Sequence, residues 1–90
     1  MKQVLPYISV GLNDENRCIV VVEDYELFDF VDEFLTQEWD LFCEYRTNRN
    51  RSGGEVLTMF FPLDITPAVI EASLSSLSPA EIERIYKLNN

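Results

Sequence analysis

Carboxylates are the most numerous chemically active side chains of this 90-residue chain. It has 16 Asp and Glu residues, 7 Lys and Arg residues and no His, for a net charge of -9. Nine of the acids lie between Cys18 and Tyr45, a stretch without Lys or Arg, and the seven acids elsewhere balance the seven basic residues. The nine are Glu23, Asp24, Glu26, Asp29, Asp32, Glu33, Glu38, Asp40 and Glu44. The whole net charge therefore belongs to one segment in the middle of the chain.

The pattern from Asp24 to Gln37 predicts an amphipathic helix that positions many of these acids. At 100° per residue, its large apolar side chains fall within one arc of about 160°. Those residues are Leu27, Phe28, Phe30, Val31, Phe34 and Leu35. The opposite arc carries Glu26, Asp29, Asp32 and Glu33. Asp24 is placed to cap the helix, where a carboxylate accepts from free backbone N–H groups.

This acidic helix face is the candidate site for binding a partner. Like charges three or four residues apart cost a few tenths of a kcal/mol per pair, and the segment has no cation to offset them. A coherent negative face accelerates association with a basic protein. We therefore expect Glu26, Asp29, Asp32 and Glu33 to contact a basic protein partner. Asp40 and Glu44 would join them if the following strand exposes that face.

The resulting hypothesis is a small acidic protein-interaction domain. Inhibitors and immunity proteins of enzymes that act on nucleic acids use the same electrostatic principle, because an acidic patch can occupy a site built for phosphates. The competing interpretation is a solvated face that only confers solubility. A metal site on Asp29, Asp32 and Glu33 is disfavoured, because helical carboxylates without a loop rarely enclose a divalent cation. No metal and no other cofactor is expected.

A second candidate site contains Arg46, Arg49 and Arg51, in a polar stretch that ends with Gly53 and Gly54. The sequence predicts a hairpin loop there, and arginine matches phosphate or carboxylate oxygens. This alternative is a regulatory module that contacts RNA or an acidic protein, although a net charge of -9 opposes nucleic acid binding. A third interpretation is a homodimeric structural protein without ligand. In such a twofold dimer each arginine loop could cover the partner's acidic helix.

The sequence gives little support for catalysis. The absence of His removes the commonest general base and metal ligand. Gly53 and Gly54 lack the pattern of a phosphate-binding loop. Cys18 and Cys43 lie 25 positions apart, and Glu44 would raise rather than lower the pKa of the neighbouring Cys43 thiol. The chain is therefore not expected to be an enzyme.

The two cysteines are predicted to be free thiols in a reducing cytoplasm. The sequence has neither a run of about 20 apolar residues that could span a membrane nor the apolar core of a signal peptide near its first residues. We expect a cytoplasmic protein that does not enter membranes.

The predicted elements form one domain over residues 1–90. The expected strands are Gln3–Val10, Arg17–Glu23, Trp39–Arg46 and Glu55–Phe61, and helices are expected at Asp24–Gln37, after Thr66 and after Ser78. Pro6 predicts an edge or a bulge in the first strand, and the β-branched second strand is expected to be central and buried on both faces. The fold class is α+β, a two-layer sandwich. It has a four-stranded, mainly antiparallel sheet in ββαββαα order, with helices packed on one face.

Overall fold

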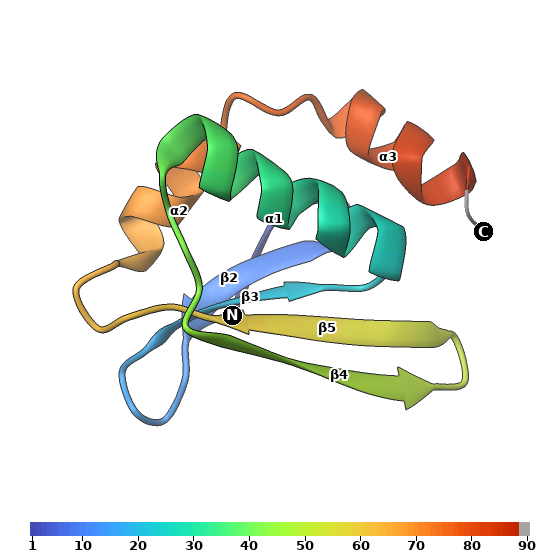
Figure 1. Cartoon of the computed structure of the whole chain (residues 1–90). Coiled ribbons are helices and arrows are strands. Elements are labelled where there is room, and N and C mark those ends of the chain that lie inside the picture. Colours follow the sequence, from blue (N-terminus) through green and yellow to red (C-terminus); the bar gives the residue numbers. More distant parts are fainter. Residues whose placement is uncertain (89–90) are drawn as a thin grey trace.

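A computed structural model describes residues 1–88 and shows an α+β fold with five strands and three helices (Figure 1). The strands are β1 (Lys2–Leu5), β2 (Ile8–Leu12), β3 (Cys18–Val22), β4 (Tyr45–Arg51) and β5 (Gly54–Phe60), and the helices are α1 (Tyr25–Trp39), α2 (Pro67–Leu74) and α3 (Pro79–Leu88). The predicted α+β class and antiparallel sheet are confirmed. The predicted strand number is wrong, since the order is βββαββαα.

The five strands form one antiparallel sheet in the order β1-β2-β3-β5-β4, and the three helices cover one of its faces (Figure 1). The burial of the central strand β3 differs between its two faces, because the helices cover only one face of the sheet. Val20 and Val22 point into the core and are fully buried, whereas Ile19 and Val21 are partly exposed on the other face. The expectation that this strand is buried on both faces is therefore wrong.

The hydrophobic core lies between the sheet and the helices. Ile8, Val20 and Met59 from the sheet are fully buried, as is Leu35 of α1. The two C-terminal helices contribute as well, with Ile82 of α3 fully buried. Each helix therefore gains stability by covering apolar surface of the sheet.

Pro6 divides the predicted first strand into β1 and β2. Proline cannot donate a ladder hydrogen bond, and the β1–β2 register shifts between Gln3 and Leu5. Tyr7 follows with a left-handed backbone, at φ 65°. The expectation of an edge position is confirmed for β1, while the register shift lies before Pro6 and the turn at Pro6 and Tyr7 accounts for the fifth strand.

Helix α1 is confirmed and runs two residues beyond the predicted Gln37. The Asp24 Oδ2 accepts a 2.9 Å hydrogen bond from the backbone N–H of Leu27, as expected of an N-cap. Trp39 is the last residue of the helix, and Asp40 ends it in a left-handed conformation at φ 57°. The predicted strand over Trp39–Arg46 is therefore wrong.

Strand β4 occupies most of the stretch that the sequence predicts as a loop. It begins at Tyr45, and the hairpin turn comes at Ser52 and Gly53, just before Gly54 with φ 124°. All seven residues of β4 are exposed, because it is the outer strand of the sheet. A strand with solvent on both sides has no apolar alternation, which is why its composition resembles a loop.

The predicted starts of the last two helices are confirmed. The Thr66 hydroxyl accepts from the backbone N–H of Val69, and Pro67 is the first residue of α2. The Ser78 hydroxyl likewise accepts from the N–H of Glu81 at the start of α3. These caps fix where α3 begins and so where its side chains meet α1.

Candidate protein-binding surface

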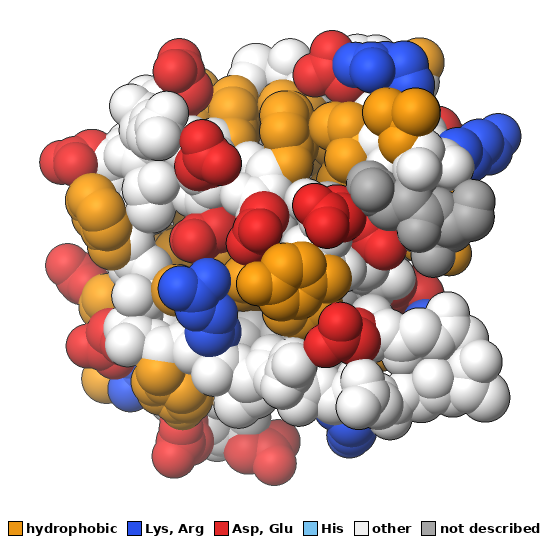
Figure 2. All heavy atoms as spheres, turned by 45° about the vertical axis from the view of Figure 1, so that its right-hand side comes forward, with side chains coloured by type: hydrophobic (Ala, Val, Ile, Leu, Met, Phe, Trp, Pro, Cys, Tyr) orange, Lys and Arg blue, Asp and Glu red, His pale blue; other side chains and the backbone are white. Residues whose placement is uncertain are grey.

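The outer face of α1 carries a row of exposed carboxylates. Glu26, Asp29 and Glu33 are exposed, and their spacing of three and four residues places them on one side of the helix. We call these three residues the acidic ridge. Figure 2 shows acidic side chains gathered across the middle of the face that it views, with hydrophobic side chains beside them.

One groove borders the acidic ridge on the side of β4 and has a volume of about 320 Å³. Its lining residues are Tyr25, Phe28, Asp29, Arg46, Thr47, Asn48 and Leu57. The Arg46 guanidinium lies 5.5 Å from the centroid of the Phe28 ring, and its Nη1 is 3.5 Å from the Oδ2 of Asp32. On this side the chain therefore supplies a cation to its own acidic helix.

A second groove, of about 360 Å³, lies on the other side of the ridge, between α1 and α3. Its lining residues are Phe30, Glu33, Phe34, Gln37, Glu38, Leu77 and Glu81. The apolar residues of this α1–α3 groove are half-buried, while Glu33, Glu38 and Glu81 are exposed at its rim. No Lys or Arg is among the described residues that line it. Arg84 lies beside the rim, with its Nη2 3.7 Å from the Oε2 of Glu81.

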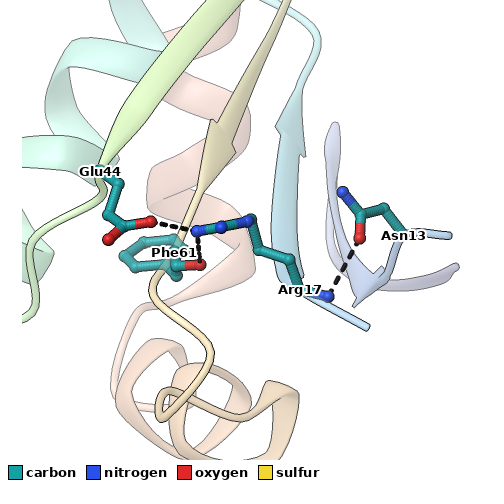
Figure 3. Close-up of polar contacts among 4 residues, drawn as sticks. All are labelled: Asn13, Arg17, Glu44 and Phe61. Atoms are coloured by element: carbon teal, nitrogen blue, oxygen red, sulfur yellow. Dashed lines mark hydrogen bonds and ion pairs between the residues drawn. The ribbon is translucent and has the colours of Figure 1, made fainter. Parts of the chain in front are cut away.

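The remaining two predicted partner-binding residues lie apart from the acidic ridge. Asp40 is exposed at the C-terminal end of α1, the opposite end from Glu26. Glu44 precedes β4 and forms an ion pair with Arg17 (Figure 3). The fold thus brings together the four predicted partner-binding acids of α1, with Asp32 half-buried, but does not add Asp40 and Glu44 to the same row.

Arg17 is held in place by several contacts at the corner where Glu44 lies. Its Nη1 donates a 2.9 Å hydrogen bond to the carbonyl of Phe61, and its backbone N–H donates to the Oδ1 of Asn13 (Figure 3). The guanidinium also lies 5.8 Å from the centroid of the Tyr45 ring. Glu44 is therefore engaged in an ion pair within the protein, at a corner where Arg17 joins several elements of the fold.

The three arginines of the alternative site do not form one loop cluster. Alternate residues of a strand face opposite sides, so Arg46 faces α1 while Arg49 and Arg51 face the open side of the sheet. The Nη2 of Arg51 lies 2.6 Å from the Oε1 of Glu23. The prediction of an arginine loop is wrong, because these residues belong to β4, and two of the three cations pair with acids of the same chain.

These pairs reduce the number of uncompensated carboxylates but leave the acidic ridge unchanged. Arg46 offsets Asp32, Arg51 offsets Glu23, and Asp24 is a buried helix cap. Within residues 1–88, no ion pair joins a member of the ridge to a Lys or Arg. The ridge therefore faces solvent without an internal cation among the described residues, as do Glu38 and Asp40 near the end of α1.

The α1–α3 groove could not be predicted from the sequence. Phe30 and Phe34 were expected in the core with the rest of the apolar arc, yet they are half-buried and line the groove. Leu77 and Glu81 reach it from a distant part of the chain, beyond α2. No periodic signal in the sequence could have joined these residues, because only the docking of α3 on α1 does so.

The thiols have raised pKa values, which oppose nucleophilic chemistry. Burial raises the pKa of Cys18 to about 11, and burial with the nearby charge of Asp32 raises that of Cys43. Over residues 1–88, no group of three or more His, Cys, Asp or Glu side chains is arranged to hold a metal ion. None of the helices in that range is long and apolar enough to cross a membrane.

Comparisons with known proteins do not add to this description. No protein-family model matches the chain, and neither curated proteins nor solved structures gave a significant match.

Proposed function

We propose that this chain is a small acidic interaction domain that binds a basic protein surface through α1, as an inhibitor or immunity-type protein would. The observation that carries the proposal is the acidic ridge of Glu26, Asp29 and Glu33, which is exposed and has no internal cation within residues 1–88. Repulsion within this row costs the free protein some stability, and a cationic partner would remove that cost on binding.

Electrostatics also suggest the class of partner. A negative row on a rigid helix presents charges about 5–6 Å apart along one side, so it can engage several cations at once. Enzymes that act on nucleic acids have such cationic clusters, because they bind the phosphate backbone with Lys and Arg. An acidic domain of this kind could block such a surface, and its association would be fast at low salt.

The arginine-based alternative has less support than the acidic ridge. Arg46 and Arg51 already pair with Asp32 and Glu23, which leaves Arg49 as the least engaged cation of the three. One such cation on a body with a net charge of -9 would release few counterions from RNA. The same pairs weaken the hypothesis of a twofold dimer held by these arginines.

Affinity capture from a cell lysate tests the proposal. The tagged protein is compared with a double variant, Glu26→Lys with Asp29→Lys, and with a control of equal charge change, Asp14→Lys with Glu15→Lys, in the turn before β3. All four positions are exposed, so the variants should fold as the parent does. We expect the parent and the control to retain basic proteins in about 50 mM salt, and the ridge variant to lose them.

Two outcomes would contradict this function. One is capture that is the same for the ridge variant and the parent. The other is a mobility shift of mixed RNA by the parent protein in about 50 mM salt, which would favour the arginine-based alternative.

A further inference from the structure

The two grooves beside α1 differ in a way that the sequence does not reveal. Both have an apolar floor and both touch the acidic helix. The groove toward β4 already contains Arg46, which lies over Phe28 and reaches Asp32. The α1–α3 groove contains no described cation and has Glu33, Glu38 and Glu81 at its rim.

We propose that the α1–α3 groove is the docking site for a basic amphipathic segment of the partner protein. Hydrophobic side chains of that segment would contact Phe30, Phe34 and Leu77, and Lys or Arg residues beside them would pair with the rim carboxylates. This inference rests on the proposed function, and it names the part of the surface and the chemistry of the partner.

The shape and the charge of the groove support the same occupant. The floor consists of two phenylalanines one helical turn apart on α1 and a leucine from the connection between α2 and α3. Such an apolar strip between helices accepts a hydrophobic anchor, as in helix-in-groove recognition. Glu81 already has Arg84 beside it, but an apolar ligand alone would leave Glu33 and Glu38 without a cation from the described part of the chain. A segment with cations on either side of its anchor satisfies both the apolar floor and these carboxylates.

Arg46 shows inside the molecule the kind of contact that the partner would make. Its guanidinium combines an aromatic face with a carboxylate of α1, so the helix has the geometry to hold an arginine between Phe and Asp side chains. The α1–α3 groove likewise combines aromatic rings, Phe30 and Phe34, with a carboxylate of α1, Glu33. The difference is that no described residue of this chain supplies the cation there.

A defined peptide tests the docking site directly. The probe is a fluorescently labelled 14-residue amphipathic peptide made of Leu and Lys, and its binding to the full chain is measured by fluorescence anisotropy in about 100 mM salt. A Lys/Ser peptide of the same length and charge controls for electrostatic attraction alone. We expect the Leu/Lys peptide to bind at least about tenfold more tightly than the Lys/Ser peptide.

Two double variants of equal charge change then separate the groove from the acidic ridge. Glu38→Lys with Glu81→Lys alters the rim of the α1–α3 groove outside the ridge, and Glu26→Lys with Asp29→Lys alters ridge residues that do not line this groove. We expect the rim variant to weaken the Leu/Lys peptide by about tenfold or more and the ridge variant to have a smaller effect. Leu77→Ser, which removes part of the floor, should weaken the Leu/Lys peptide without changing the Lys/Ser peptide.

The outcomes distinguish this inference from the proposed function. If the ridge variant weakens the peptide and the rim and Leu77 variants do not, the docking site is wrong while an acidic binding face remains. If no variant changes binding, both proposals fail. Light scattering of the free protein adds one more outcome, because a stable dimer that is broken by Leu77→Ser would mean that a second copy covers the groove. That result would overturn the proposed occupant.

Discussion

Phe60 and Phe61 are consecutive residues of one type, yet they lie on opposite faces of the sheet. Phe61 is fully buried between the sheet and the helices. Phe60 is half-exposed on the open face, where its ring stacks on that of Tyr45 with centroids 4.4 Å apart. The covered face therefore obtains its stability from a shared core, whereas side chains on the open face depend on pairwise contacts.

Charged side chains are also distributed differently on the open side and the helical side of the sheet. Arg17 pairs with Glu44 and Arg51 pairs with Glu23, so two arginines on the open side of the sheet have an acidic partner. The helical side has the acidic ridge and the rim of the α1–α3 groove, where most carboxylates have no cation within residues 1–88. This contrast is consistent with the proposal that the helical side, rather than the open face, binds a basic partner.

The largest expected effect comes from removing each of the two phenylalanine rings. Phe61→Ala should lower the free energy of unfolding by about 3–5 kcal/mol, because it leaves a cavity in a closely packed core. Phe60→Ala should cost about 1–2 kcal/mol, since it loses one aromatic pair and partial burial. Urea denaturation followed by circular dichroism measures both. Equal losses for the two variants would mean that the open face is covered by something in solution.

An intermediate effect is expected at the corner of the open face. Arg17→Ala removes a hydrogen bond to the Phe61 carbonyl and the ion pair with Glu44, and the Arg17 side chain is only 19% exposed. We expect a loss of about 1–3 kcal/mol in the free energy of unfolding. Glu44→Ala, in a half-exposed side chain, should cost less than about 1 kcal/mol. Equal losses in the free energy of unfolding for Glu44→Ala and Arg17→Ala would contradict this expectation.

The smallest expected effect on the free energy of unfolding is at Tyr7, which connects α3 to the bend between β1 and β2. Its hydroxyl donates a 2.7 Å hydrogen bond to Glu83, and its ring stacks on Tyr86. The hydrogen bond to Glu83, followed by burial, raises the pKa of Tyr7 from 10.0 to about 12. Folding thus favours the neutral phenol, so this contribution to stability is complete below pH 10 and is lost as the pH rises toward 12.

The Tyr7→Phe variant isolates this dependence. The difference in unfolding free energy between the parent and the variant should be constant at pH 7–9 and should shrink at higher pH, because the variant has no phenol at this position to titrate. Urea denaturation at about pH 8 and about pH 11 measures the difference. A parent and a variant that lose stability in parallel over this range would show that Tyr7 does not titrate with the predicted shift.

The elements with strong local signals could be predicted from the sequence. Helix α1 has a wide apolar arc and a capping Asp24, and α2 begins where Thr66 and Pro67 indicate. The edge position of β1 also follows from the missing N–H of Pro6, although the sequence did not show that a turn at Pro6 separates two strands. Local chemistry is sufficient in these cases because the signal and the structure involve the same few residues.

Errors arose where tertiary position overrides the local pattern. The alternation from Trp39 to Tyr45 favours a strand, but Asp40 ends α1 and an irregular connection follows over residues 41–44. Strand β4 has no apolar face to reveal it, because it pairs on one side only and both its faces meet solvent.

The candidate site shows the same limit. The acidic ridge belongs to one helix, so helical spacing predicts it. The α1–α3 groove combines residues near positions 30–38 with Leu77 and Glu81, and only the packing of α3 creates it. The charge of the surface could therefore be predicted from the sequence, but its shape could not.

The composition of β4 has a further consequence for how copies of this protein meet. An outer strand offers backbone groups to which another chain could add, and such edges promote aggregation. Here the strand carries Arg46, Arg49 and Arg51, so two copies paired edge to edge would place like charges close together. The arginines thereby discourage growth of the sheet from one molecule into the next.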